Sequence, residues 1–143
     1  MNVETILAGK GRDVLTIAPD ATVAEAVARL AAARVGAVVV STDGTTISGI
    51  LSERDIIHGL AEHGGALLDS PVDRLMTRDV ETCRLADTDQ EVLAMMTERR
   101  FRHLPVVEDG ALTGIVSIGD VVKSRLDGVV SDADAMRDYI SRG

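Results

Sequence analysis

The sequence predicts an α/β (α+β) protein built from two similar halves, and three observations support this prediction. A pattern of about 65 residues occurs twice, which is too long a period and too few copies for a solenoid. Each copy alternates apolar residues at helical spacing with short runs rich in β-branched residues. The chain of 143 residues is long enough to bury a core without disulfides or metals.

The two copies can be aligned residue by residue. Thr22 aligns with Thr88 and, after one residue of slack in a turn, residues 49–55 align with residues 114–120. We therefore expect a first copy over 1–69 and a second over 70–127.

Each copy is expected to follow the order strand, helix, strand, strand, helix. Thr22 to Glu25 and Thr88 to Glu91 have the sequence of a capping box, which begins a helix. A second helix is expected to begin at Ser52 in the first copy and at Ser117 in the second. The strands expected after the first helix of each copy are 37–40 and 47–51, and then 104–107 and 112–116.

The last segment, residues 128–143, is charged and is expected to form a tail helix. It should pack on the body or on a partner chain. Its two sides differ, with Asp132, Asp134 and Asp138 on one and Met136 and Ile140 on another.

The composition limits the possible partners. There are 15 Lys+Arg against 23 Asp+Glu, a net charge of −8, which argues against nucleic acid. Phe101 and Tyr139 are the only aromatic residues, so base stacking is not expected. No apolar run reaches the ~20 residues of a membrane helix, and no secretory signal is recognisable. A single cysteine, Cys83, excludes an internal disulfide, and a cytoplasmic protein fits these features.

One motif occurs at the same place in both copies: glycine, two apolar residues, serine, two further residues and aspartate. It places Ser52 with Asp55, and Ser117 with Asp120, where a strand gives way to a helix. Free amides at a helix start attract anions, and an ionised aspartate can accept hydrogen bonds from two ribose hydroxyls. The same spacing can also be a plain capping box. The residues alone leave both interpretations open.

The whole pattern resembles a tandem pair of cystathionine-β-synthase (CBS) domains, also called a Bateman module, over roughly residues 3–127. The matching segments are 35–40, Asp43-Gly44 and 49–55 in the first copy, and 101–107, Asp109-Gly110 and 114–120 in the second. The resemblance implies two halves related by pseudo-twofold symmetry, with two clefts between them. It also implies adenosine-containing ligands, namely AMP, ADP, ATP, NAD or S-adenosylmethionine.

The resemblance also implies roles for individual residues. Asp55 and Asp120 would bind ribose hydroxyls, and Ser52 and Ser117 would lie near the ribose or α-phosphate. Val39 departs from the family, which often has proline there, as at Pro105. The segments that would line the adenine pockets are Thr16, Ile17, Ala18, Val35, Gly36 and Ala37, and then Thr82, Cys83, Arg84, Arg102, His103, Leu104 and Pro105.

Several of these residues have alternative interpretations. Arg54 could reach a phosphate or simply be solvated at a helix start, and Arg102 and His103 are further candidates for phosphate contact. Cys83 aligns with Ile17, which favours a buried apolar role over a reactive thiol. No metal site is expected, because no cysteine or carboxylate cluster accompanies the histidines.

These features together predict a regulatory module without catalytic residues. It would bind an adenine nucleotide, with AMP favoured and NAD or ATP as alternatives. The resemblance implies a homodimer, in which two modules meet through helices to form a flat disc, and a client protein that the sequence does not identify. The alternative is a ligand-free adaptor that acts through a protein partner. An enzyme acting on nucleotides finds no support in the residues.

Overall fold

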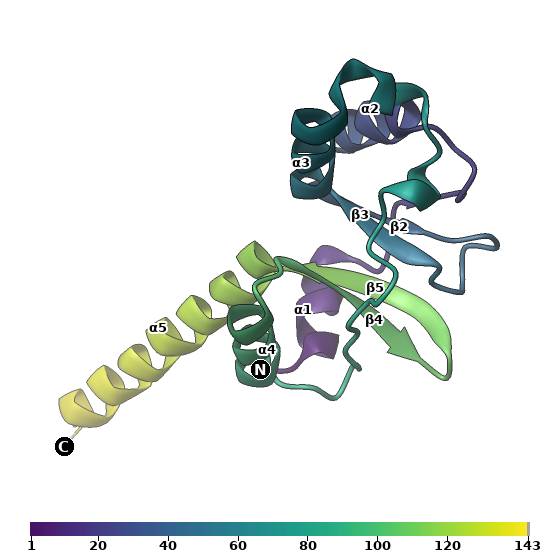
Figure 1. The fold of residues 1–143 in the computed structure, drawn as a ribbon. Helices are drawn as coiled ribbons and strands as arrows, with labels where there is room; N and C mark the ends of the chain where they lie inside the picture. Colours follow the sequence, from purple (N-terminus) through teal and green to yellow (C-terminus); the bar gives the residue numbers. More distant parts are fainter. Residues whose placement is uncertain (143) are drawn as a thin grey trace.

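The computed structural model describes residues 1–142 and confirms a mixed α/β fold with two halves (Figure 1). Two short 3-10 helices, η1 (Gly64–Asp69) and η2 (Val72–Arg74), connect the halves. The helices and strands are α1 (Val3–Lys10), β1 (Thr16–Ile17), α2 (Val23–Ala33), β2 (Ala37–Val40), β3 (Gly49–Ser52), α3 (Glu53–His63), α4 (Asp89–Arg99), β4 (His103–Glu108), β5 (Ala111–Ser117) and α5 (Ile118–Arg142). None of the described helices is both long enough and apolar enough to cross a bilayer.

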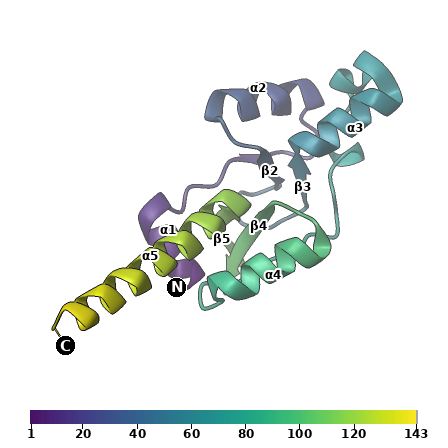
Figure 2. The same ribbon diagram turned by 90° about the vertical axis from the view of Figure 1, so that its left-hand side faces the viewer.

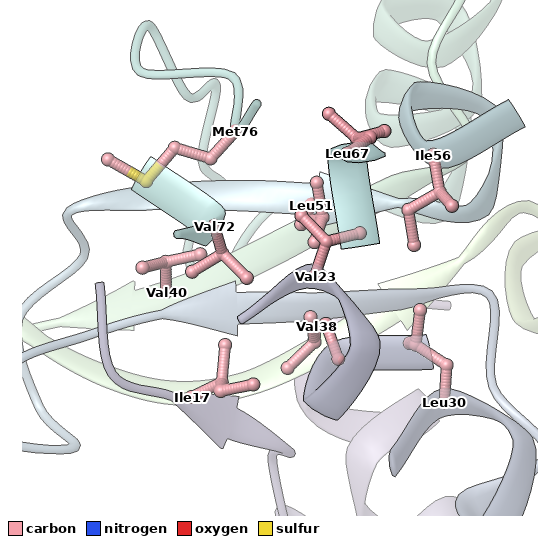
Figure 3. Close-up of a cluster of buried hydrophobic side chains, with 11 residues drawn as sticks. Ile17, Val23, Leu30, Val38, Val40, Leu51, Ile56, Leu67, Val72 and Met76 are labelled. Carbon is pink, nitrogen blue, oxygen red and sulfur yellow. The ribbon is translucent and has the colours of Figure 1, made fainter. Parts of the chain in front are cut away.

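The first half is a three-stranded sheet of order β1-β2-β3. β1 pairs with β2 in parallel, and β2 pairs with β3 antiparallel, with Val38 opposite Leu51. Apolar side chains of α2 and α3 pack on this sheet, as Figure 3 shows for Val23, Leu30 and Ile56. All four residues of β2 are buried, which fits a short strand covered on both sides.

The second half has a two-stranded antiparallel sheet, β4-β5. The strand expected at its start is reduced to one parallel bridge between Cys83 and Val106. In the first half, the Val39 amide donates to the Leu15 carbonyl and extends the ladder. Pro105 occupies the aligned position and has no amide hydrogen, so the second half cannot form this bond.

The leading segments of the two copies cross over. Val3, Ile6 and Leu7 of α1 belong to the core of the second half, whereas Val72 and Met76 belong to the core of the first. Equivalent backbone hydrogen bonds hold the two segments: the Val3 amide donates to the Asp87 carbonyl oxygen, and the Val72 amide donates to the Ala21 carbonyl oxygen. Each half is therefore completed by the segment that precedes the other copy.

The C-terminal helix differs from the expected separate tail. α5 is continuous from Ile118 to Arg142, so it extends the second helix of the second copy. Figures 1 and 2 show its distal part leaving the body instead of folding back onto it. Its apolar side chains there are exposed: Met136 by 60% and Ile140 by 68%. Of the two contacts expected for this segment, packing on the body is not found in the described residues, and packing on a partner chain stays a prediction.

Candidate functional site

A cavity of about 260 Å³ lies where the two halves meet at the start of α3. Its wall comes from β2, from the β3–α3 junction, from the segment that links the copies and from the residues before β4. The lining residues are Gly36, Ala37, Ile50, Ser52, Glu53, Arg54, Asp55, Thr77, Asp79, Val80, Glu81, Arg100, Phe101, Arg102 and His103. Elements of both halves are therefore needed to form the site, which we call the first cleft.

Ser52 and Asp55 form a complete capping box at the start of α3. The Asp55 amide donates to Ser52 Oγ at 3.2 Å, and the Ser52 amide donates to Asp55 Oδ2 at 3.0 Å. The structural interpretation of the motif is thus realised. In the part of the chain that the structure describes, nothing donates to Oδ1 of Asp55. This half-buried carboxylate therefore caps the helix with one oxygen and leaves the other for a ligand.

Gly36, Glu53 and His103 lie close together in the wall of the first cleft. A Cβ at position 36 would be 3.2 Å from Cε1 of His103 and 3.3 Å from Oε1 of Glu53. Burial lowers the pKa of His103; Glu53 and Asp120 oppose this effect, while Lys10 and Arg102 add to it. The imidazole is consequently neutral at pH 7 and offers one donor and one acceptor.

Three arginines at this cleft can meet an anion. Arg54, Arg100 and Arg102 are exposed, and among the described side chains no acidic group lies within ion-pair distance of them. Glu81, in contrast, pairs with Arg99. The cleft thus combines a carboxylate suited to hydroxyl groups with cations suited to phosphate.

The equivalent motif at the start of α5 lies where the resemblance implies a second cleft, and we keep the name second cleft for this expected site. Its electrostatic state differs from that of the first. The Ser117 amide donates to Asp120 Oδ2 at 2.8 Å, as in the first capping box. Lys10 Nζ lies 2.6 Å from the same oxygen and 3.0 Å from the Ile115 carbonyl oxygen. Burial alone would raise the pKa of Asp120, but the bonds from Lys10 and Ser117 outweigh it and lower the pKa. Asp120 is therefore already paired with a cation.

The structure brings together some of the predicted residues and separates others. Ile17, Cys83 and Leu104 are buried in the two cores, and Pro105 is also buried. Thr16, Ala18, Val35, Thr82 and Arg84 lie outside the lining of the first cleft, and Ser117 and Asp120 are at the second. The predicted residues that line the first cleft are Gly36, Ala37, Ser52, Arg54, Asp55, Arg102 and His103.

Sequence reasoning missed the contribution of the leading segments. Thr77, Asp79 and Val80 line the first cleft, and Lys10 pairs with Asp120 at the second. These residues lie just upstream of the aligned positions Thr82 and Thr16. Asp79 and Val80 repeat Asp13 and Val14 of the first copy, and this repetition was the available signal. Thr77 and Lys10 align with Gly11 and Met76, so nothing in the repeat singles them out.

Comparisons with known proteins agree with this architecture. The model of the CBS domain matches residues 10–62 and again residues 72–127. A mitochondrial CBS domain-containing protein of Arabidopsis thaliana is 30% identical, over 99% of this chain and 72% of that protein. The chain belongs to the CBS domain family and carries a tandem pair of these domains.

Two solved structures are close in fold. The CBS-domain containing protein of Agrobacterium tumefaciens is 44% identical, with a TM-score of 0.84 over 87% of this chain and 92% of that one. A CBS domain protein of Pyrobaculum aerophilum, described as complexed with AMP, is 27% identical. Its TM-score is 0.75 over 84% of this chain and 89% of that one.

Proposed function

We propose that this protein is a regulatory module that binds an adenine nucleotide in the first cleft, and that the ligand is AMP. The observation that carries this proposal is the free Oδ1 of Asp55 beside a cavity bordered by three cationic side chains. Asp55 would accept the ribose hydroxyls, and Arg54, Arg100 and Arg102 would meet the phosphate. The AMP complex of the Pyrobaculum aerophilum protein supports this choice.

The size of the cavity favours a mononucleotide. Its volume of about 260 Å³ lies just below the range of roughly 300–1,000 Å³ typical of small-molecule pockets. The longer ligand NAD, or the additional phosphates of ADP and ATP, would have to extend into solvent. Four acidic residues, Glu53, Asp55, Asp79 and Glu81, also line the site and oppose additional phosphate charge. NAD, ADP, ATP and S-adenosylmethionine remain the alternatives to AMP.

Binding at the junction of the two halves provides a route to regulation. A ligand that contacts β2, α3 and the segment before β4 stabilises the arrangement of halves that brings them together. The protein would pass this shift to a second copy of the chain or to a client protein in the cytoplasm. It would do so without catalysing a reaction, since the first cleft would bind and orient the nucleotide but its lining residues include no activated nucleophile.

A ligand-free adaptor is the second candidate. It is favoured by the complete capping boxes at Ser52–Asp55 and Ser117–Asp120, which give both motifs a structural role. The two candidates differ in what a change at Asp55 does. Asp55→Asn keeps an oxygen that can accept from the Ser52 amide but removes the charge and the free carboxylate oxygen.

The test is a thermal-unfolding screen against AMP, ADP, ATP, NAD, NADH and S-adenosylmethionine. A ligand at 100 times its Kd adds about 2.7 kcal/mol of stability, which raises Tm by several degrees in a domain of this size. We expect a shift with AMP that Asp55→Asn reduces by half or more, while Tm without ligand changes little. A folded protein that responds to none of these compounds would favour the adaptor.

A further inference from the structure

The distal part of α5 carries an apolar seam with regular spacing. The residues at intervals of alternately four and three positions are Val122, Leu126, Val129, Ala133, Met136 and Ile140. This is the a/d pattern of a coiled coil, here sustained over more than two heptads. The large apolar side chains of this seam are exposed in the single chain, from 40% at Val122 to 68% at Ile140. We call these six residues the α5 seam.

The α5 seam points away from the body of its own chain. Val121 and Ser124 are the buried residues of α5 among those whose burial the structure describes, and Ser124 donates to Asp89 of α4 at 2.9 Å. At 3.6 residues per turn, the centre of the seam lies about a third of a turn around the helix from the centre of that packed side. The seam is thus free along its length to meet another helix.

The charges beside the seam determine which helix fits. In the heptad frame Asp132 occupies a g position, and Arg137 occupies the e position five residues later. In a parallel pair of identical helices, a g residue faces the e residue of the next heptad on the partner. Asp132 of each chain would therefore meet Arg137 of the other, twice by symmetry.

An antiparallel pair of the same helices would bring like charges together. It would place g beside g and e beside e, so Asp132 would face its own copy and Lys123 would face Arg137. Within one chain, Arg137 is only 3.9 Å from Asp134 in an exposed pair, and such pairs are weak enough to exchange. Val130, at the other e position, is 59% exposed and widens the apolar surface.

We propose that the α5 seam is the interface for a second copy of this chain, formed as a parallel two-stranded coiled coil. The apolar side chains at a and d would be removed from water, and the Asp132–Arg137 pairs would set the orientation. This contact lies on the projecting helix and is separate from any contact between the bodies of two modules. It predicts that substitutions more than ten residues beyond the packed part of α5 control assembly.

The test is sedimentation velocity of the full chain over a range of concentrations, with three sets of variants. Met136→Lys and Ile140→Lys should each raise the Kd of the dimer by about tenfold or more, because they place a charge in the seam. Asp138→Lys, a charge change outside the a, d, e and g positions, should leave it unchanged. Asp132→Lys and Arg137→Glu should each weaken the dimer, and the double variant should restore it. All these side chains are exposed in the monomer, so far-UV circular dichroism should be the same.

Orientation is tested with Ile140→Cys under mild oxidation. In the parallel pair the two copies of position 140 meet and form a disulfide. In the antiparallel pair centred near position 131 they would be about 27 Å apart at 1.5 Å per residue, and no crosslink would form. A wild-type chain that stays monomeric, a dimer indifferent to Met136→Lys, or the absence of the Ile140→Cys crosslink in a dimer would each overturn the proposal.

Discussion

Lys10 and Asp120 lie 110 positions apart in the sequence, yet Nζ of Lys10 is 2.6 Å from Oδ2 of Asp120. The contact exists because α1 crosses to the second half and ends at the start of α5. Asp55, the equivalent carboxylate of the first half, pairs with no cation among the described residues, although Oδ1 accepts no hydrogen bond from them in either motif. Two motifs with the same sequence pattern therefore have different capacities for a ligand.

Removing the lysine should make the clefts more alike. In Lys10→Met, Asp120 loses its cation and its carboxylate becomes available for ribose hydroxyls. We expect the number of AMP molecules bound per chain to rise from one to two in isothermal titration calorimetry. Stability should fall by no more than about 1 kcal/mol, since the pair is partly exposed.

The same variant has a pH signature. The lowered pKa of Asp120 contributes stability above its ordinary value, and this stability is lost as pH falls through the folded pKa. Lys10→Met should raise the pKa of Asp120 in a carboxyl-carbon NMR titration. A Lys10→Met protein that no longer binds AMP at all would show that Lys10 contacts the ligand, which contradicts the assignment to the first cleft.

His103 should make the protein sensitive to mild acid. Burial lowers its pKa in the folded state, despite the nearby carboxylates of Glu53 and Asp120. Below about pH 6.5 an unfolded histidine takes up a proton that the folded one resists, so stability falls as pH drops from there towards the folded pKa. Urea unfolding between pH 7.5 and 5.5 measures the slope of the free energy of unfolding against pH. His103→Gln should flatten it, whereas the matched change at the exposed His58 should not; equal slopes in both variants would contradict this account.

Cys83 should be unreactive in the native protein. Burial, together with the charge of Asp87, raises the pKa of its thiol to about 12. Because the thiolate is the nucleophile, alkylation by iodoacetamide at pH 8 should be slow until the chain unfolds. Mass spectrometry with and without urea gives both rates. Rapid alkylation of the folded protein would mean that the second core opens readily.

Substitutions at two glycines test whether the leading segment of the second copy packs on the first half. A Cβ at Gly49 would be 2.6 Å from Sδ of Met76 and 2.8 Å from the Thr77 carbonyl oxygen. Gly49→Ala should therefore destabilise the protein by about 1–3 kcal/mol, since the backbone of Thr77 would have to shift. Gly9, near the end of α1, has open space around it and is the control. Gly9→Ala should be neutral or slightly stabilising in the same unfolding experiment.

The local pattern of each copy could be predicted from the sequence because it is encoded locally. Thr22 and Thr88 do cap α2 and α4, and the repeated serines and aspartates do begin α3 and α5. The fold class and the family followed from these signals. Arg102 and His103 were expected beside a cleft because they immediately precede a recognisable strand, and they line the first cleft; their contact with a ligand stays a prediction.

What could not be predicted depends on contacts between distant segments. Nothing local assigns Val3 to the second core or Val72 to the first, since both lie in short apolar segments that would fit either half. The pairing of Lys10 with Asp120 depends on that crossing, so it could not be predicted from the sequence either. The shortened strand at Cys83 was accessible in principle, because Pro105 lacks the amide hydrogen that Val39 uses.

The most direct test of the central claim is calorimetric titration of AMP into the wild-type protein, Asp55→Asn and Asp120→Asn. The proposed function predicts one AMP per chain, an affinity reduced by about 10- to 100-fold in Asp55→Asn through the lost charge-assisted bonds, and little change in Asp120→Asn. Binding that survives Asp55→Asn unchanged and disappears in Asp120→Asn would place the ligand in the second cleft and contradict the account.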